Sequence, residues 1–221
     1  METSLWPIQA FDPQADYLVI ERRLPHWSQA GTVCFITFRT FDSMPAAILK
    51  RWHADRDRWL RQLGINPHEA SWRKKLAELG PATQLEFTRT FSDRWHDQLD
   101  AGHGECLLAR PELRAIIAES LRFYDGQHYQ LSDFVIMPNH VHLLAAFRDE
   151  KGMLAQCRTW KHFTATRINR ELGRNGRFWQ QDGFDHLVRS DDDFRGFQRY
   201  IAANPVKARL SEGSYTTYSR G

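Results

Sequence analysis

Two apolar runs separated by the pair Pro138-Asn139 constrain the fold of this chain more than any other feature. Tyr129–Met137 and Val141–Phe147 are rich in residues that strands favour, and proline followed by asparagine favours a turn. Such runs around a short turn predict an antiparallel hairpin. His140 and His142 stand at the start of its second strand, where residues two apart share a face. The two imidazoles are therefore expected to point the same way.

The spacing of these histidines allows two interpretations. Their attachment points lie about 6.6 to 7 Å apart, close enough for two ring nitrogens to bind one metal ion. The other interpretation is a partly exposed strand face without a ligand, which is roughly twice as common for such a pair. Spacing alone does not decide between them.

Length and composition predict one domain in a reducing compartment. The 221 residues are 42% hydrophobic, which suffices for a sizeable core. Cys34, Cys106 and Cys157 are odd in number and far apart, which argues against a disulfide framework and a cysteine metal site. No apolar run approaches the roughly 20 residues of a membrane span, and residues 1–6 do not resemble a signal peptide. We expect a single cytoplasmic domain over residues 1–221, with no membrane partner.

Basic residues concentrate in one segment. The formal net charge of +3 permits a nucleic-acid partner without requiring one. Residues 151–177 carry seven basic side chains against one acidic one, Glu171. Contacts with phosphates are one interpretation of this segment. An ordinary solvated helix face is the other, because most charge runs are solvated.

The residues before the hairpin divide into a lead-in, a strand and a helical segment. Residues 1–30 contain scattered prolines and aromatics and predict irregular structure, whereas Thr32–Phe38 predicts a central strand. Residues 45–63 repeat apolar side chains at helical spacing, and Phe87, Phe91, Trp95 and Leu99 do so at steps of four. We expect a helical insertion over residues 45–105 within the single domain.

The elements around and after the hairpin predict a ferredoxin-like fold. Pro111 opens a helix, and a long helix follows the hairpin from about Met153 to Leu172. A short strand then precedes a last helix, which Ser190 caps and which ends before Pro205. Without residues 45–105, the order is strand, helix, strand, strand, helix, strand, helix. The predicted fold class is α+β, with an RRM-like antiparallel sheet, helices on one face and an additional C-terminal helix.

The last helix carries Tyr200 and Asn204, which are one turn apart and project from one face. If that face turns toward the histidine strand, the Asn204 carbonyl oxygen completes a metal site and Tyr200 approaches a substrate atom held there. Each residue also has an ordinary interpretation. Tyrosines on amphipathic helices are usually core residues, and asparagine before proline commonly ends a helix.

Two motifs and their spacing resemble a known family. Met137-Pro-Asn-His-Val-His-Leu-Leu144 is followed about sixty residues later by Tyr200-Ile-Ala-Ala-Asn-Pro-Val-Lys-Ala208. Both are similar to motifs of the HUH single-strand transposases of bacterial insertion sequences, and more narrowly of the REP-associated tyrosine transposases. The resemblance covers roughly residues 20–210 in order. Secondary similarities are Leu24-Pro-His-Trp27, Trp160-Lys161, and Trp179-Gln180 leading into residues 184–189.

The resemblance implies a role for each matched residue. His140 and His142 would be metal ligands, Asn204 the polar third ligand and Tyr200 the nucleophile. Family members cut single-stranded DNA next to a hairpin, forming a covalent bond from the tyrosine to the 5′ phosphate and leaving a free 3′ hydroxyl. A 3′ hydroxyl can then reverse the reaction and join strands. The expected activity is that of a metal-dependent nickase and strand transferase acting on repeated extragenic (REP) hairpins or on the ends of its own element.

Magnesium or manganese is the expected ion. Two imidazoles and an oxygen leave open positions, where a divalent ion can neutralise charge that develops on a phosphate. Because the pKa of free tyrosine is near 10, Tyr200 must lose its proton to act as a nucleophile. The field of the metal, water, or a neighbour such as Lys207 or His186 would remove it, and the sequence favours none of these.

Two other functions are compatible with the sequence. One is a catalytically inactive nucleic-acid-binding protein of the same fold, suggested by its sheet-plus-helix outline and basic helix. The other is hydrolysis by a histidine-bound metal using water, which leaves the tyrosine without a role. We expect single-stranded DNA hairpins as the partner, a cytoplasmic location at the nucleoid, and a monomer or homodimer, since relatives use both. The residues expected to contact DNA are Arg158, Lys161, Arg167, Arg170 and Lys207.

Overall fold

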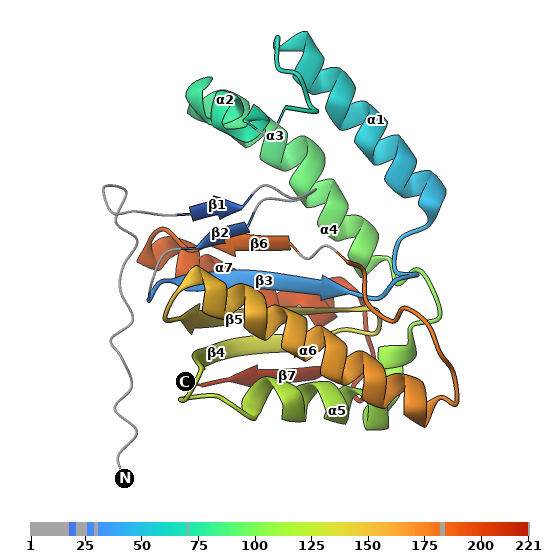
Figure 1. The fold of residues 1–221 in the computed structure, drawn as a ribbon. Helices are drawn as coiled ribbons and strands as arrows, with labels where there is room; N and C mark the ends of the chain where they lie inside the picture. The colour runs from blue at the N-terminus through green and yellow to red at the C-terminus, as the bar shows by residue number, and fades with distance from the viewer. Residues whose placement is uncertain (1–17, 21–25, 29–30, 70, 182–183, 221) are drawn as a thin grey trace. The chain divides into compact units, whose positions relative to one another are not determined.

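A five-stranded antiparallel sheet is the centre of the larger of two compact units in the computed structural model (Figure 1). The structure describes residues 18–20, 26–28, 31–69, 71–181 and 184–220. The larger unit comprises residues 1–41 and 106–221, and its sheet has the strand order β6-β3-β5-β4-β7. These strands are β3 (Val33–Arg39), β4 (Tyr129–Ile136), β5 (His140–Phe147), β6 (Phe184–Leu187) and β7 (Thr216–Ser219).

The larger unit has the ferredoxin-like order that the sequence predicted. Along the chain, β3 is followed by α5 (Pro111–Arg122), the β4–β5 hairpin, α6 (Glu150–Glu171) and β6. A single-turn 3₁₀ helix (Leu107–Ala109) precedes α5. β3 and β5 are the central strands, with β6 beside β3 and β4 beside β5, as this topology requires. The α+β fold class is therefore confirmed, and α7 (Asp191–Lys207) is the expected additional helix.

Helices cover both faces of this sheet. α5 and α6 pack over a large apolar core on one face, where the Trp160 indole donates a hydrogen bond to the Ser120 carbonyl (3.2 Å). α7 packs on the opposite face over a smaller cluster that includes Phe35 of β3, Leu144 of β5 and Ile201 of α7. In Figure 1, α5 and α6 lie in front of the sheet and α7 lies behind it. Successive residues of each strand therefore point alternately toward α5 and α6 or toward α7.

Backbone hydrogen bonds hold the turn between β4 and β5. The Met137 amide donates to the His140 carbonyl (2.8 Å) and closes the hairpin that the sequence predicted. The Leu108 amide donates to the Pro138 carbonyl (2.9 Å), which ties the turn to the segment before α5. The start of β5 is fixed from two sides as a result.

α7 continues beyond Pro205, although the sequence predicted that it ends there. Proline lacks an amide hydrogen and its ring crowds the carbonyl four residues earlier, so it usually ends or kinks a helix. Here the helix runs to Lys207, and the Ala208 amide donates to the Asn204 carbonyl (2.9 Å). Asn204 and Pro205 are both buried. Packing of this last turn on the sheet outweighs the one hydrogen bond that proline cannot make.

Three short strands were not predicted. β1 (Leu18–Ile20) and β2 (His26–Ser28) pair antiparallel within the lead-in that was expected to be irregular. Residues 1–17, 21–25 and 29–30 lie outside the described part of the chain, including the first residues of the family-like motif Leu24–Trp27. β7 pairs with β4 at the sheet edge. Strands of three or four residues are too short to show a clear alternation of apolar and polar residues.

Residues 42–105 form a second compact unit made of helices. Its core includes Leu60, Ile65, Trp72 and Leu76. The apolar residues at steps of four from Phe87 to Leu99 lie in helical structure as predicted, but a π-helical turn interrupts the α-helices. None of the helices in the described residues has the length and apolar character of a membrane span. The helices of this unit are α1 (Ala46–Gln62), α2 (Trp72–Glu78), α3 (Pro81–Phe87), the π-helical turn (Thr88–Ser92) and α4 (Asp93–Asp100).

Candidate functional site

The two histidines lie at the start of β5, on the face of the sheet that α7 covers. His140 pairs with Arg39 of β3 and His142 pairs with Thr37, and directly opposed residues point to the same face. Both histidine side chains are 0% exposed, and their ring centroids are 4.6 Å apart at an interplanar angle of 72°. The histidine pair is therefore buried, and the interpretation as a partly exposed strand face is wrong.

One ring nitrogen of each histidine is engaged by a neighbouring side chain. The Nδ1 atom of His140 lies 2.7 Å from Oδ1 of the Asn139 side chain, an amide oxygen that only accepts, so Nδ1 carries the hydrogen. The Nδ1 atom of His142 lies 2.8 Å from the Thr37 hydroxyl oxygen. Metal-binding histidines are usually oriented by such a bond to the nitrogen that does not face the metal. In this arrangement Nε2 is the atom of each ring suited to bind an ion.

Tyr200 brings α7 to the same place. Its ring centroid lies 5.2 Å from that of His142, at 71°, and 5.9 Å from that of Phe35. Phe35 in turn stacks on His142 (5.2 Å) and on Phe197 (4.4 Å). Rings packed this closely have few rotamers open to them, so the phenol is held beside the histidine pair. Strand and helix, about sixty residues apart in sequence, meet here as their motifs suggested.

Asn204 lies one turn after Tyr200 on the side of α7 that packs against the sheet. Its side chain is 1% exposed, and within the described residues neither its amide nitrogen nor its carbonyl oxygen has a hydrogen-bond partner. Burying an unpaired amide costs about 1–3 kcal/mol, so such groups are rare unless they bind something. The orphaned amide therefore suits the role of an oxygen ligand.

The two histidines and Asn204 are of the residue types that can bind a divalent ion. Two imidazole nitrogens and an amide oxygen would form a mixed donor set. Such a set binds Mg²⁺ or Mn²⁺ less tightly than a set of carboxylates does, and it suits Mn²⁺ better than Mg²⁺. His140, His142 and Asn204 would hold the ion, and three protein ligands leave coordination positions for a phosphate oxygen and water.

Two of the other tyrosines, Tyr129 and Tyr218, are poorly placed to act as a nucleophile at this site. Tyr129 lies on the α5 and α6 side of the sheet and donates a hydrogen bond to the Leu121 carbonyl (2.7 Å). Burial raises the pKa of its phenol to about 12, which disfavours the phenolate. Tyr218 stacks on Phe134 instead of approaching the histidines (5.2 Å).

The structure does not bring the basic residues of α6 to this site, because α6 covers the opposite face. Lys161 donates from Nζ to the carbonyls of Gln180 and Gln181 (3.1 Å each), so it holds a loop. Arg167 pairs with Glu119 (3.5 Å), and Arg158 and Arg170 are exposed.

The two candidates for removing the tyrosine proton are Lys207 and His186. Lys207 is exposed in the last turn of α7. His186 pairs through its backbone with Phe35, and its side chain lies outside the described part of the structure.

Sequence reasoning missed the two residues that orient the histidines. Asn139 was interpreted only as part of a turn, and Thr37 only as a strand residue. The polarity of Asn139 directly before the histidine strand was an available signal. Thr37 gave none, because threonine is common in strands and its partner is 105 positions away.

Comparisons with known proteins include a similar solved structure. Neither the models of known protein families nor the curated proteins include a match to this chain. A solved structure of a REP-associated tyrosine transposase bound to a REP hairpin superposes with a TM-score of 0.44 and 14% sequence identity. The alignment covers 85% of this chain and 74% of the other. A likeness at this level gives no information about activity.

Proposed function

We propose that this protein is a metal-dependent single-stranded DNA nickase and strand transferase, with Tyr200 as nucleophile and His140, His142 and Asn204 as metal ligands. The observation that carries the proposal is the buried Asn204 amide, which has no hydrogen-bond partner in the described part of the chain and lies one turn from a tyrosine whose ring contacts His142. A nucleic-acid-binding protein without catalysis has no use for such an amide. Hydrolysis by metal-bound water has no use for the tyrosine.

The proposed reaction is a transesterification. The Tyr200 hydroxyl loses its proton, and its oxygen forms a bond to the phosphorus of the scissile phosphate. The bond from phosphorus to the 3′ oxygen breaks, and that oxygen takes up a proton to give a free 3′ hydroxyl. When bound, the metal ion supplies positive charge that stabilises the phosphate as negative charge develops on it. A 3′ hydroxyl attacking the phosphotyrosine runs the same steps in reverse and joins two strands.

The packing of the site contributes orientation. Phe35 contacts the rings of both His142 and Tyr200, so one side chain sets the angle between nucleophile and ligand. The Asn139 and Thr37 hydrogen bonds fix the two imidazoles. Holding reacting groups in place before the substrate arrives lowers the entropic part of the barrier.

The substrate proposal extends to hairpins of the REP type, on the strength of the two motifs. Magnesium or manganese as the cofactor, a location at the nucleoid and a monomeric or homodimeric state are proposed on the same basis. Lys207 and the α6 residues Arg158, Lys161, Arg167 and Arg170 are proposed contacts to the DNA backbone.

The test is to trap the covalent intermediate. Hairpin-containing single-stranded DNA labelled downstream of the cut is incubated with the protein and Mg²⁺ or Mn²⁺, and adducts are separated on a denaturing gel. The native protein is expected to form an adduct, and Tyr200→Phe to form none, because phenylalanine has no oxygen to attack phosphorus. Tyr124→Phe is the matched control and should behave like the native protein, because Tyr124 lies just after α5 and packs against the core on the face of the sheet opposite the histidines.

Three results would count against the proposal. An adduct that persists in Tyr200→Phe removes Tyr200 as the nucleophile. Cleavage without any adduct in both proteins points to hydrolysis by water. Tight, strongly salt-dependent binding with no cleavage of any hairpin favours the inactive binding protein.

A further inference from the structure

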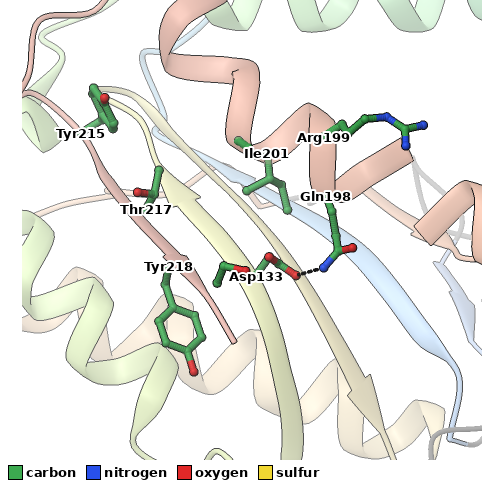
Figure 2. Close-up of a pocket in the computed structure, with 9 residues that line it drawn as sticks. Asp133, Gln198, Arg199, Ile201, Tyr215, Thr217 and Tyr218 are labelled. Carbon is green, nitrogen blue, oxygen red and sulfur yellow. Dashed lines mark hydrogen bonds between the residues drawn. The ribbon is translucent and has the colours of Figure 1, made fainter. Parts of the chain in front are cut away.

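A groove of about 560 Å³ lies on the α7 face of the sheet, between α7 and the edge strand β7 (Figure 2). Its volume is typical of sites that bind small molecules or parts of larger ligands. One wall is formed by Gln198, Ile201 and Ala202 of α7. The other wall is formed by Tyr215, just before β7, and Thr217 of β7. Asp133 of β4 lies between the walls, and Arg199 lies at the rim.

Asp133 is the unusual member of this groove. Asp133 is buried, with 5% of the residue exposed. Its Oδ2 atom accepts hydrogen bonds from the Gln198 amide nitrogen (3.0 Å) and from the Ser132 hydroxyl. Both donors are neutral, and both hydrogen bonds end on Oδ2. No ion pair with this carboxylate occurs in the described part of the chain. A buried carboxylate without a cation is costly, so a donor that reaches Oδ1 from the groove would be bound favourably.

The rest of the lining fits the other parts of a nucleotide. Tyr215 is partly exposed and offers an aromatic surface on which a base can stack. Arg199 is exposed and offers a cation to a phosphate. An acceptor, a stacking surface and a cation therefore occur within one groove.

The position of the groove relates it to Tyr200. Gln198 and Tyr200 are two residues apart, about 200° around the helix, so they leave α7 on opposite flanks. Arg199 lies between them on the outer surface of α7, where Ala202 and Ala203 are small and exposed. A DNA strand that presents a phosphate to Tyr200 can thus cross α7 past Arg199 and reach the groove.

We infer that the groove binds a nucleobase of the single-stranded substrate, a few nucleotides from the scissile phosphate, with Asp133 accepting a hydrogen bond from the base. This inference rests on the proposed function for the identity of the strand. It predicts a preference among bases. Cytosine carries an amino group where uracil carries a carbonyl oxygen, so a carboxylate attracts the edge of the first and repels that of the second.

The experiment measures equilibrium binding of oligodeoxycytidine and oligodeoxyuridine of equal length, by fluorescence anisotropy, in EDTA so that no cleavage occurs. The native protein is expected to bind the cytosine oligomer about tenfold more tightly, the effect of one hydrogen bond to a charged acceptor. Asp133→Asn is expected to reduce this ratio to about one, because its amide can donate to the uracil carbonyl. Glu119→Gln, which removes the same charge from α5 on the other face, should keep the native ratio.

A second variant guards against misfolding of Asp133→Asn. Thr217 is exposed on β7, where tryptophan is a good strand former, and Thr217→Trp fills the groove. It should bind both oligomers with similar affinity. Equal binding of both oligomers by the native protein, or an unchanged ratio in Thr217→Trp, would overturn the inference. Base preference without adduct formation in the cleavage assay would contradict the proposed chemistry and leave the groove assignment intact. Adduct formation without base preference would contradict the groove assignment and leave the proposed chemistry intact.

Discussion

At the scale of single residues, Asn204 shows how function and stability conflict at this site. Among the residues that the structure describes, nothing forms a hydrogen bond with the amide nitrogen or the amide oxygen of Asn204, and a buried amide without partners destabilises the fold. The residue also directly precedes Pro205, and a residue before proline is disfavoured in helical conformation. Two unfavourable features at one position are easiest to explain if the amide has a partner that the polypeptide does not supply.

Replacing Asn204 by leucine separates these two roles. Asn204→Leu keeps a similar shape and removes the unpaired polar atoms, so we expect the metal-free variant to be as stable as the native protein or more stable, by up to about 1–3 kcal/mol. Native protein should be further stabilised by Mn²⁺, since an ion that binds only the folded state raises the unfolding free energy. The variant should lose most of that gain. Urea denaturation with EDTA and with Mn²⁺ measures both effects.

Asn169→Leu is the control for this experiment. Asn169, near the end of α6, donates from its amide to the Gly176 carbonyl (2.8 Å), so its loss should destabilise the protein without changing the response to Mn²⁺. An Asn204→Leu protein that is much less stable in EDTA, or that responds normally to Mn²⁺, would contradict the assignment of Asn204 as a ligand.

Sequence reasoning reached part of this site. Strand alternation alone placed His140 and His142 on one face, and helical spacing alone placed Tyr200 beside Asn204. Neither rule indicates which face of the sheet a helix covers. The contact between His142 and Tyr200 therefore came from the resemblance and the structure (5.2 Å). The roles of the four residues stay predictions.

At the scale of elements, the buried Arg114 forms hydrogen bonds that hold the segment after α7 in place. Arg114 of α5 is 4% exposed, and its Nη1 atom donates to the carbonyls of Leu108 (2.8 Å) and Ala109 (2.6 Å). Its other nitrogens donate to the Gly213 carbonyl and the Thr216 hydroxyl (3.1 Å). Burial lowers the pKa of this guanidinium, although it stays charged. The arginine thus joins β7 to the turn that precedes α5.

Arg114→Met should loosen β7. Its carbonyl partners would lose their donors, which costs about 1–3 kcal/mol for each one that stays buried, so we expect a loss of about 2–4 kcal/mol in unfolding free energy. Urea denaturation gives the value, and hydrogen exchange at Thr216–Ser219 should accelerate. Arg110→Met, at an exposed position just before α5, should cost less than about 0.5 kcal/mol. Similar losses in both variants would show that the arginine does not hold the segment.

The sequence predicts the long elements better than the short ones. The hairpin, α5 and α6 are long and periodic, and all three were predicted. β7 has four residues, and its place beside β4 depends on Arg114 and on the packing of Tyr218 on Phe134. Contacts between residues far apart in sequence leave no local pattern. The same reason explains the last turn of α7, where burial of Asn204 and Pro205 overrides a local stop signal.

At the scale of the whole sheet, the two surfaces proposed to meet DNA lie on opposite faces. The histidines, Tyr200 and the groove are on the α7 face, and the exposed arginines of α6 are on the other. A hairpin substrate has a duplex stem and a single strand, and these could contact different surfaces. Phosphate contacts on α6 would then contribute to affinity and leave the chemistry untouched.

The double variant Arg158→Gln and Arg170→Gln tests this separation. If both arginines contact phosphates, affinity for hairpins of any sequence should fall, and the slope of log K against log salt should shrink by about one for each residue. At saturating DNA, the rate of adduct formation should match that of the native protein, because the sheet separates these side chains from Tyr200. Arg110→Gln, an exposed arginine outside α6, should change neither quantity. An unchanged salt slope would remove both residues from the DNA footprint, and a slower reaction at saturation would mean that α6 acts on the chemistry after all.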